Sequence, residues 1–335
     1  MVCVAHQTTP LMATSSRRRF LKIAAVQSLA FACWGQVRAE RAPELTAQRW
    51  RGIALGGEVG IDLYGVGDTR GVFEKCRQEM LRLERNFSLY QNDSALCRLN
   101  RNGVLRDTPA ELIEVLQFAR AVSEITAGAF DVTVHPLCEV LAGGVTTDQE
   151  IEDARRRIDY RALEIEGGVV QLTKPGMAVT LNGVAQGYIT DRITTVLAEH
   201  GYTAALVDMG EKRALGPHPE NRPWRVGVRS PDGDADELAG VFDLPAHRAI
   251  ATSGGYGQLY AAVGRHHLVD ARDGLSRQTW RSVSVIAGDA MTADALSTAL
   301  AVSEPDQAQR ILQSFPTAQP QAKILTAEGT WISLG

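Results

Sequence analysis

Residues 289–300 read DAMTADALSTAL, and this pattern predicts a buried helix. Ala, Leu and Met dominate the stretch, neither Gly nor Pro interrupts it, and Asp289 can cap its start after the strand-like run SVSVIA. A helix that is apolar on almost every side is normally buried. Asp294 lies inside it, and a buried carboxylate is costly unless it is paired or binds a metal ion. The stretch therefore raises the question of what Asp294 pairs with.

Composition places the chain among ordinary globular proteins. Its 335 residues are 44% hydrophobic and 22% charged, with a formal net charge of −4. This length allows one large domain or two modest ones with a sizeable core. The lack of a basic excess argues against a nucleic-acid partner, and no apolar run is long enough for a membrane-spanning helix in the mature chain.

The first 39 residues are predicted to be a twin-arginine signal peptide rather than part of the fold. Residues 16–22 match the pattern S-R-R-x-F-L-K, an apolar stretch follows, and a V-R-A cleavage site ends at Ala39. Met12 is a second candidate start, because it gives a tighter leader. Since this route exports folded proteins, we expect the domain of residues 40–335 to fold before it reaches the periplasm.

Helical and strand-like segments interleave along the mature chain without a steady βαβ rhythm, which favours an α+β fold over a parallel doubly wound sheet. The cysteines that remain after cleavage fit neither a disulfide framework nor a zinc site, so we predict buried thiols. The clearest predicted helices are residues 71–87, 109–126, 148–158, 184–200, 290–302 and 305–315. The predicted strands are a pair within 49–66, a short strand that ends at Pro136, a hairpin and strand within 162–181, a strand over 204–210, several strands from residue 224, and a last strand over 322–334.

Three features point towards a metal ion and a phosphorylated ligand, although each of them alone also occurs in ordinary proteins. Asp294 and Thr298 are four residues apart on one helix face, so both can offer oxygen to one hard cation. The turn LNGVAQG, residues 181–187, places backbone N–H groups and a helix start where an anion can bind. The segment GRHHLVDARDG, residues 264–274, ends a predicted strand with paired histidines and an acidic turn.

Taken together, these segments resemble the ApbE-like FAD:protein FMN transferases. The matching blocks cover nearly the whole mature chain in the expected order, and the resemblance implies an ApbE-like α+β fold with mixed or antiparallel sheets flanked by helices. The blocks are A-M-x-A-D-A-L-[AS]-T at 290–298, G-A-[FW]-D at 128–131, A-T-S-G at 251–254, an early tyrosine segment at 87–100, and H-x-[IV]-D-P-x-[ST]-G at 267–274 with Ala271 and Asp273 as departures.

The resemblance also implies site residues. Mg²⁺ would be held by the side chains of Asp294 and Thr298 and by the carbonyl of Gly183. Asp294 and His267 would be the catalytic residues, with His267 as a candidate general base because imidazole titrates near neutral pH. The residues expected to bind FAD are Leu55, Tyr90, Ala129, Phe130, Asp131, Thr180, Gln186, Ser253, His267 and Leu268.

In the implied reaction FAD is the substrate and Mg²⁺ the cofactor. A Thr or Ser hydroxyl of a partner protein attacks the phosphorus of the FMN half of FAD, and AMP leaves. The twin-arginine leader makes the chain similar to the periplasmic flavin transferases that are accessory to nitrous-oxide respiration. The partner would then be a periplasmic acceptor, such as a membrane-bound respiratory flavoprotein.

The chain departs from the family pattern at the turn D-[LF]-[GS]-G-[IV]-A-K-G. Thr180 replaces the Asp and Gln186 replaces the Lys, which removes one negative and one positive group. The block G-G-D-[IV] is altered to MGEK at residues 209–212. Two alternatives therefore stay open: a periplasmic FAD-binding protein without transferase activity, and an FAD pyrophosphatase that gives FMN and AMP.

Overall fold

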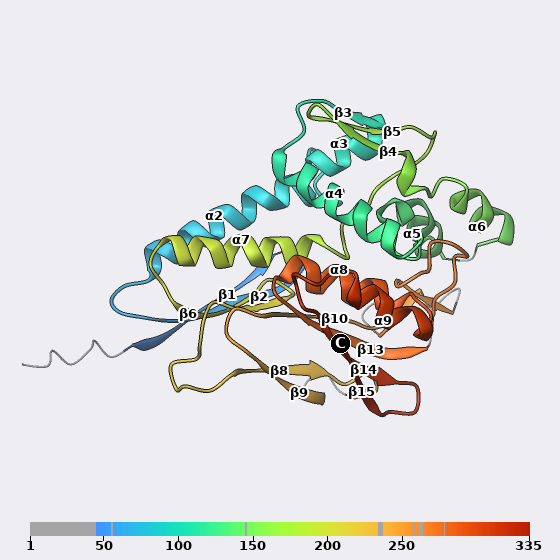
Figure 1. Cartoon of the computed structure of the whole chain (residues 1–335). Coiled ribbons are helices and arrows are strands. Elements are labelled where there is room, and N and C mark those ends of the chain that lie inside the picture. Colours follow the sequence, from blue (N-terminus) through green and yellow to red (C-terminus); the bar gives the residue numbers. More distant parts are fainter. Residues whose placement is uncertain are drawn as a thin grey trace, which may run out of the picture. The chain divides into compact units, whose positions relative to one another are not determined.

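An eight-stranded sheet forms the frame of the fold (Figure 1). Every strand pairing recorded in it is antiparallel. Its strands, in spatial order, are β1 (Thr46–Ala54), β2 (Gly57–Gly65), β6 (Ala204–Asp208), β7 (Lys212–Ala214), β10 (Ala249–Ser253), β13 (Trp280–Ala287), β14 (Gln321–Thr326) and β15 (Trp331–Leu334). The computed structural model describes residues 45–54, 56–144, 146–233, 237–256, 259–260, 264–277 and 279–335. The predicted signal peptide and Leu55 lie outside these residues.

Alternating side chains give the sheet two different faces. On β13, Val283 and Val285 pack into the core that contains α8 (Ala290–Ala301), whereas Ile286 packs with the opposite face. On β2, Ile61 and Leu63 face the helices. Because side chains on a strand alternate with a period of two, the strands β2, β6, β10 and β13 contribute to the cores on both faces.

Three helices cover one face of the sheet: α2 (Arg70–Phe87), α7 (Ala185–Glu199) and α8 (Figure 1). The apolar side of α2 faces the core, because Val72, Cys76, Met80 and Leu83 are all buried. On the other face lies the ribbon of β8 (Trp224–Arg229) and β9 (Leu238–Leu244), whose Trp224 and Leu244 pack into a smaller core.

The remaining described elements are helices, 3₁₀ turns and short strands outside the eight-stranded sheet. They are α3 (Ala95–Asn102), α4 (Ala110–Ile125), the 3₁₀ turns η1 (Val132–Val134) and η2 (Tyr160–Ala162), α5 (His135–Ala142), α6 (Asp148–Arg155) and α9 (Pro305–Gln313), with a sheet of β3 (Val104–Leu105), β5 (Val169–Leu172) and β4 (Leu163–Glu166) and a pair of β11 (Leu259–Tyr260) and β12 (Arg265–His266). None of the described helices is both long and apolar enough to cross a membrane.

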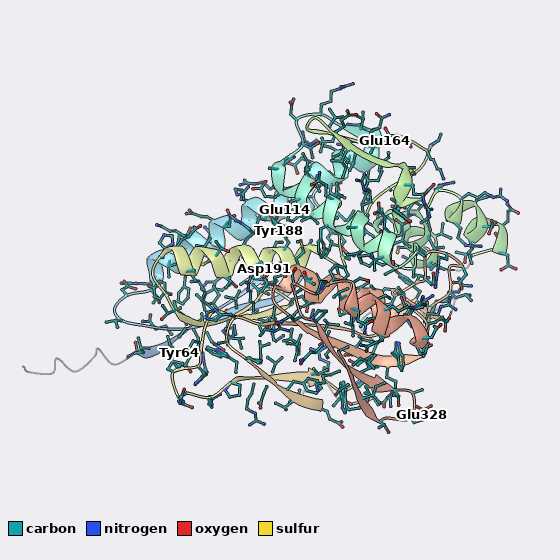
Figure 2. The ribbon with its side chains drawn as sticks, in the orientation of Figure 1. Tyr64, Glu114, Glu164, Tyr188, Asp191 and Glu328 are labelled. Carbon is teal, nitrogen blue, oxygen red and sulfur yellow. The ribbon has the colours of Figure 1, made fainter. Side chains whose placement is uncertain are left out.

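The N-terminus of α8 is capped twice. The carboxylate of Asp289 accepts a hydrogen bond from the Thr292 N–H at 2.7 Å, as the sequence predicted. Asp191 of α7 accepts the N–H groups of Ala290 and Met291 at 2.8 and 2.9 Å, and Figure 2 shows it where the two helices meet. A negative charge at a helix N-terminus is favourable. Asp191 therefore locks α7 to the start of α8.

The two helices also approach closely at Gly187. A Cβ atom at this position would strike the Ala290 carbonyl and would lie 2.8 Å from the Cβ of Asp294. Glycine is thus required here because the backbone of one helix lies against the other. This close approach places the first turn of α7 beside Asp294.

The fold class and the predicted helices are confirmed, but three strand predictions are wrong. The run after Gly128 forms η1 and α5 instead of a strand ended by Pro136. Proline suits the first turn of a helix, where no N–H partner is needed. The segment before Leu181 is not a strand. The chain end forms the β14–β15 hairpin, which turns at Gly329 with φ +81°.

The prediction for the thiols is confirmed only in part. Cys76 is buried, whereas Cys97 and Cys138 are half-buried, and all three described cysteines are free. Burial raises the pKa of the Cys76 thiol to about 12, which makes it inert as a nucleophile.

The close approach of α7 and α8 can be tested by adding one methyl group. We expect Gly187→Ala to lower the free energy of unfolding by about 1–3 kcal/mol or more, because the Ala290 carbonyl leaves no room for it. Gly71→Ala in α2 is the matched control, since nothing lies within 4 Å of its added Cβ. It should be neutral or stabilise by about 0.5–1 kcal/mol. Urea unfolding measures both, and equal small effects would contradict the close approach.

Candidate functional site

A cavity of about 480 Å³ lies between the first turn of α7, the face of α8 that carries Asp294 and Thr298, and the loops after α4 and β10. Cavities of this size suit small-molecule ligands. Every predicted site residue that the structure describes lines it: Tyr90, Ala129, Phe130, Asp131, Thr180, Gly183, Gln186, Ser253, His267, Leu268, Asp294 and Thr298. The structure thus brings together residues that are more than 200 positions apart in the chain.

Asp294 is the most constrained charged group of this cavity. The residue is 3% exposed, and its Oδ2 accepts a hydrogen bond from the Gly187 N–H at 3.0 Å. Among the described residues, no Lys, Arg or His forms an ion pair with it. Burial, together with the charge of Asp191, raises the pKa of the Asp294 carboxyl to about 7. The described part of the chain therefore supplies this carboxylate with a backbone donor but no cation.

Hydroxyl and backbone oxygens lie beside Thr298, one helical turn after Asp294. The Thr298 hydroxyl lies 3.2 Å from the hydroxyl of Ser253, which in turn lies 2.7 Å from that of Ser297. The main chain of Gly183 lies close as well, since a Cβ there would be 3.1 Å from the Thr298 Oγ1. The described residues contain no metal-binding cluster of three or more His, Cys, Asp or Glu. One carboxylate with hydroxyl and backbone oxygens instead fits Mg²⁺, which takes few carboxylates and completes its shell with water and substrate phosphates.

Asp131 lines the cavity but uses its carboxylate within the protein. It accepts hydrogen bonds from the N–H and hydroxyl of Thr133 at 2.8 and 2.7 Å and from the Tyr160 N–H at 2.9 Å. Burial raises the pKa of Asp131 above its usual value, although these hydrogen bonds act to lower it. Its role here is to hold the turn that presents Ala129 and Phe130, both buried, to the cavity.

The segment that carries His267 and Leu268 is held by an ion network. Asp270 is fully buried and pairs with Arg272 at 2.6 Å and with Arg277 at 2.8 Å. Burial raises the pKa of Asp270, but the two guanidinium groups outweigh it and leave the pKa below its usual range. The network fixes the loop that directly follows His267 and Leu268, which line the cavity.

Tyr90, by contrast, projects into solvent at the cavity wall. It is 86% exposed, and its N–H donates to the Ser88 hydroxyl at 3.0 Å. A large aromatic side chain in this position can meet a ligand or a partner that approaches the opening.

Glu211 is a wall residue that the sequence analysis did not place in the site. It lies in the altered block MGEK, and its Oε2 accepts a hydrogen bond from the Thr252 N–H at 3.3 Å. Burial and the nearby charge of Asp294 raise the pKa of Glu211 well above its usual range. The only sequence signal was the departure from the family block itself.

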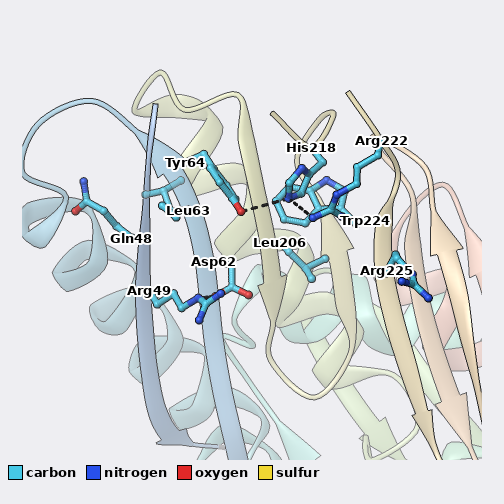
Figure 3. Close-up of a pocket in the computed structure, with 11 residues that line it drawn as sticks. Gln48, Arg49, Asp62, Leu63, Tyr64, Leu206, His218, Arg222, Trp224 and Arg225 are labelled. Carbon is cyan, nitrogen blue, oxygen red and sulfur yellow. Dashed lines mark hydrogen bonds and ion pairs between the residues drawn. The ribbon is translucent and has the colours of Figure 1, made fainter. Parts of the chain in front are cut away.

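A second cavity, of about 470 Å³, opens on the other face of the sheet (Figure 3). Tyr64, His218 and Trp224 contact one another there, and the Nε2 of His218 lies 3.2 Å from the Tyr64 hydroxyl and 3.0 Å from Arg222. Burial lowers the pKa of His218. None of the predicted site residues lines this cavity, so the first cavity is the candidate site.

Comparison with known proteins gives one family. The profile of the ApbE family matches residues 55–321. An FAD:protein FMN transferase of Klebsiella pneumoniae is 28% identical over 314 residues, which covers 87% of this chain and 89% of the relative. One of Escherichia coli K12 is 28% identical over 283 residues, covering 78% and 79%. The crystal structure of the ApbE protein of Thermotoga maritima superposes with a TM-score of 0.76 at 28% identity, covering 86% of this chain and 97% of that one.

The raised pKa of Asp294 predicts how pH changes stability without metal. Between about pH 4 and pH 7 the folded state binds more protons than the unfolded state, so stability falls as pH rises through this window. Asp294→Asn cannot ionise and escapes this loss. We expect the free energy of unfolding of the variant in EDTA, relative to that of the wild type, to rise by on the order of 2–4 kcal/mol between pH 5 and pH 8. Urea unfolding measures this difference.

The exposed Asp93 provides the control for this comparison, and Asp93→Asn should follow the wild type at both pH values. A loss of stability in Asp294→Asn that is the same at pH 5 and pH 8 would contradict the assignment. That outcome would mean that Asp294 is a structural partner in the folded protein.

Proposed function

This chain belongs to the ApbE family, and from that premise we propose that it transfers the FMN half of FAD to a Thr or Ser hydroxyl of another protein and releases AMP. The observation that carries the proposal is the single cavity in which the buried Asp294, without a cationic partner among the described residues, meets every described residue expected to bind FAD. The relatives named above carry the same activity in their names.

We propose that Asp294, Thr298 and the main chain of Gly183 hold Mg²⁺. When bound there, Mg²⁺ would neutralise negative charge on the pyrophosphate and favour AMP as the leaving group. Asp294 supplies the charge that holds the cation, and the Gly187 N–H fixes the orientation of its carboxylate. The start of α7 adds backbone N–H groups at the positive end of a helix, which also favours the phosphates.

The reaction balances as a displacement at phosphorus. The acceptor hydroxyl oxygen forms a bond to the phosphorus of the FMN half, the bond from that phosphorus to the bridging oxygen breaks, and AMP leaves with that oxygen. We assign acceptance of the hydroxyl proton to His267, because it lines the cavity and imidazole exchanges protons near neutral pH. The buried Phe130 and Leu268 form apolar wall that limits the access of water.

Location and partner belong to the same proposal. The predicted leader supports export by the twin-arginine route, so the acceptor would be a periplasmic protein or the periplasmic part of a membrane-bound respiratory flavoprotein. We propose the branch accessory to nitrous-oxide respiration, on the strength of that leader and the altered turn at Thr180 and Gln186.

The transfer can be tested with the mature chain, FAD, Mg²⁺ and candidate periplasmic acceptor domains. We expect the intact mass of the acceptor to rise by one bound FMN, with one AMP released for each. Asp294→Asn should lower the rate by about 10²–10³-fold, the usual cost of removing one preorganised electrostatic group. Asp93→Asn is the matched control and should keep the rate.

Two results would replace the proposal with an alternative. Release of free FMN and AMP, with no mass added to any acceptor, would indicate an FAD pyrophosphatase. Tight FAD binding without AMP release would indicate a binding protein.

Export is tested separately by replacing Arg17 and Arg18 together with Lys. The pair is central to the signal, so we expect uncleaved precursor to remain in the cytoplasm. Cell fractionation and mass spectrometry measure this. Processed protein in the periplasm from the double variant would contradict the proposed route, without bearing on the chemistry of the site.

A further inference from the structure

We propose that Glu211 is a second carboxylate of the divalent-cation site, and that Gln186 keeps it available by placing a neutral amide where the family pattern has a lysine. This inference rests on the proposed function, since it concerns the cation held by Asp294. It assigns a role to Gln186 and to the altered block at residues 209–212, which the reaction described above does not use.

The backbone of Glu211 is fixed by α7. The hydroxyl of Thr190 is shared between two carbonyl acceptors. It lies 2.8 Å from the carbonyl oxygen of Gln186 and 3.1 Å from that of Glu211. The Met209 N–H donates to the same Glu211 carbonyl at 3.1 Å. Gly210 has φ +104°, a conformation that L side chains rarely adopt. The turn therefore presents the Glu211 side chain to the cavity wall in a defined position.

The Glu211 carboxylate forms no ion pair with a cationic side chain among the described residues. Within the described part of the chain its recorded partner is the Thr252 N–H, and no Lys, Arg or His forms an ion pair with it. The neighbouring cations are engaged elsewhere, because Lys212 pairs with Asp208 at 3.1 Å and Arg213 pairs with Asp191 at 2.5 Å.

Glu211 and Asp294 therefore place two acidic groups at one cavity. Both side chains line the same cavity, and Asp294 is 3% exposed. Such a pair is unfavourable while both groups are ionised. A divalent cation removes the conflict, and two carboxylates are within the number that Mg²⁺ takes in sites that also bind phosphates.

Gln186 lies directly beside this turn. A Cβ atom on Gly210 would be 2.6 Å from the Gln186 Nε2, so the amide packs against the Gly210 backbone next to Glu211. A lysine at this position would bring an ammonium group towards the same carboxylate and would compete with the cation for it. The neutral amide cannot do so. The charge of Glu211 is thus left for the cation.

Direct binding of Mn²⁺, measured by calorimetry and by electron paramagnetic resonance without FAD, tests the inference. We expect Glu211→Gln to weaken Mn²⁺ binding by about 10–100-fold, the range found when groups around a metal site are removed. Gln186→Lys should also weaken it, through pairing with Glu211. In the double variant the lysine has no carboxylate to pair with, so the two effects should not add.

The controls separate this inference from the metal site as a whole. Glu164 is exposed on β4 (Figure 2), and Glu164→Gln should bind Mn²⁺ as the wild type does. Loss of binding in Asp294→Asn, with Glu211→Gln unchanged, would overturn the role of Glu211 and leave the proposed site standing. Unchanged binding in both variants would overturn the metal site itself.

Gln186→Lys keeps the test valid if Glu211→Gln fails to fold. It perturbs the same carboxylate from α7 and leaves Glu211 itself unchanged. Additive effects of the two substitutions in Mn²⁺ binding would contradict the pairing that the inference requires. Urea unfolding of each variant in EDTA identifies any change that is merely structural.

Discussion

The hydrogen bond from the Gly187 N–H to the Asp294 carboxylate is the contact on which the architecture of the site depends. It joins the first turn of α7 to the middle of α8, and it can form only because residue 187 has no side chain to hold the helices apart. Asp191 reinforces the same junction by capping α8 from α7. A carboxylate buried in this way, with a backbone donor and no protein cation among the described residues, costs stability unless something else neutralises it.

That cost is consistent with a site built for a ligand that brings positive charge. The caps at Asp191 and Asp289 fix α8, so Asp294 and Thr298 keep one orientation towards the cavity. Rigid elements hold functional groups more accurately than loops do. The loops supply the other walls, and each is tied down by its own polar contacts, such as those of Asp131 and Asp270. In the proposed function, α8 would supply the side chains that hold the cation, whereas the loops would supply most of the contacts to the flavin.

The sequence predicts correctly those helices and caps that depend on local side-chain chemistry. The α8 segment is apolar on most sides and carries its own cap, and the apolar spacing on α2 identifies the buried side. The sequence prediction was wrong where tertiary contacts decide. The β-branched run at residues 132–134 resembles a strand, yet the Asp131 cap and Pro136 turn it into a 3₁₀ turn and a helix. The sequence did not predict Glu211 as a site residue, because its position depends on the positive φ of Gly210 and on the hydrogen bond from Thr190. Hydrophobic periodicity reveals neither of these features.

The central claim is that Asp294 is buried in order to hold a divalent cation. The most direct measurement is anomalous scattering from crystals of the mature chain soaked in Mn²⁺. The account predicts a peak within coordination distance, about 2.0–2.5 Å, of the Asp294 carboxylate and the Thr298 hydroxyl, which disappears in Asp294→Asn. A fully occupied Mn²⁺ site elsewhere, with none at Asp294, would contradict the account.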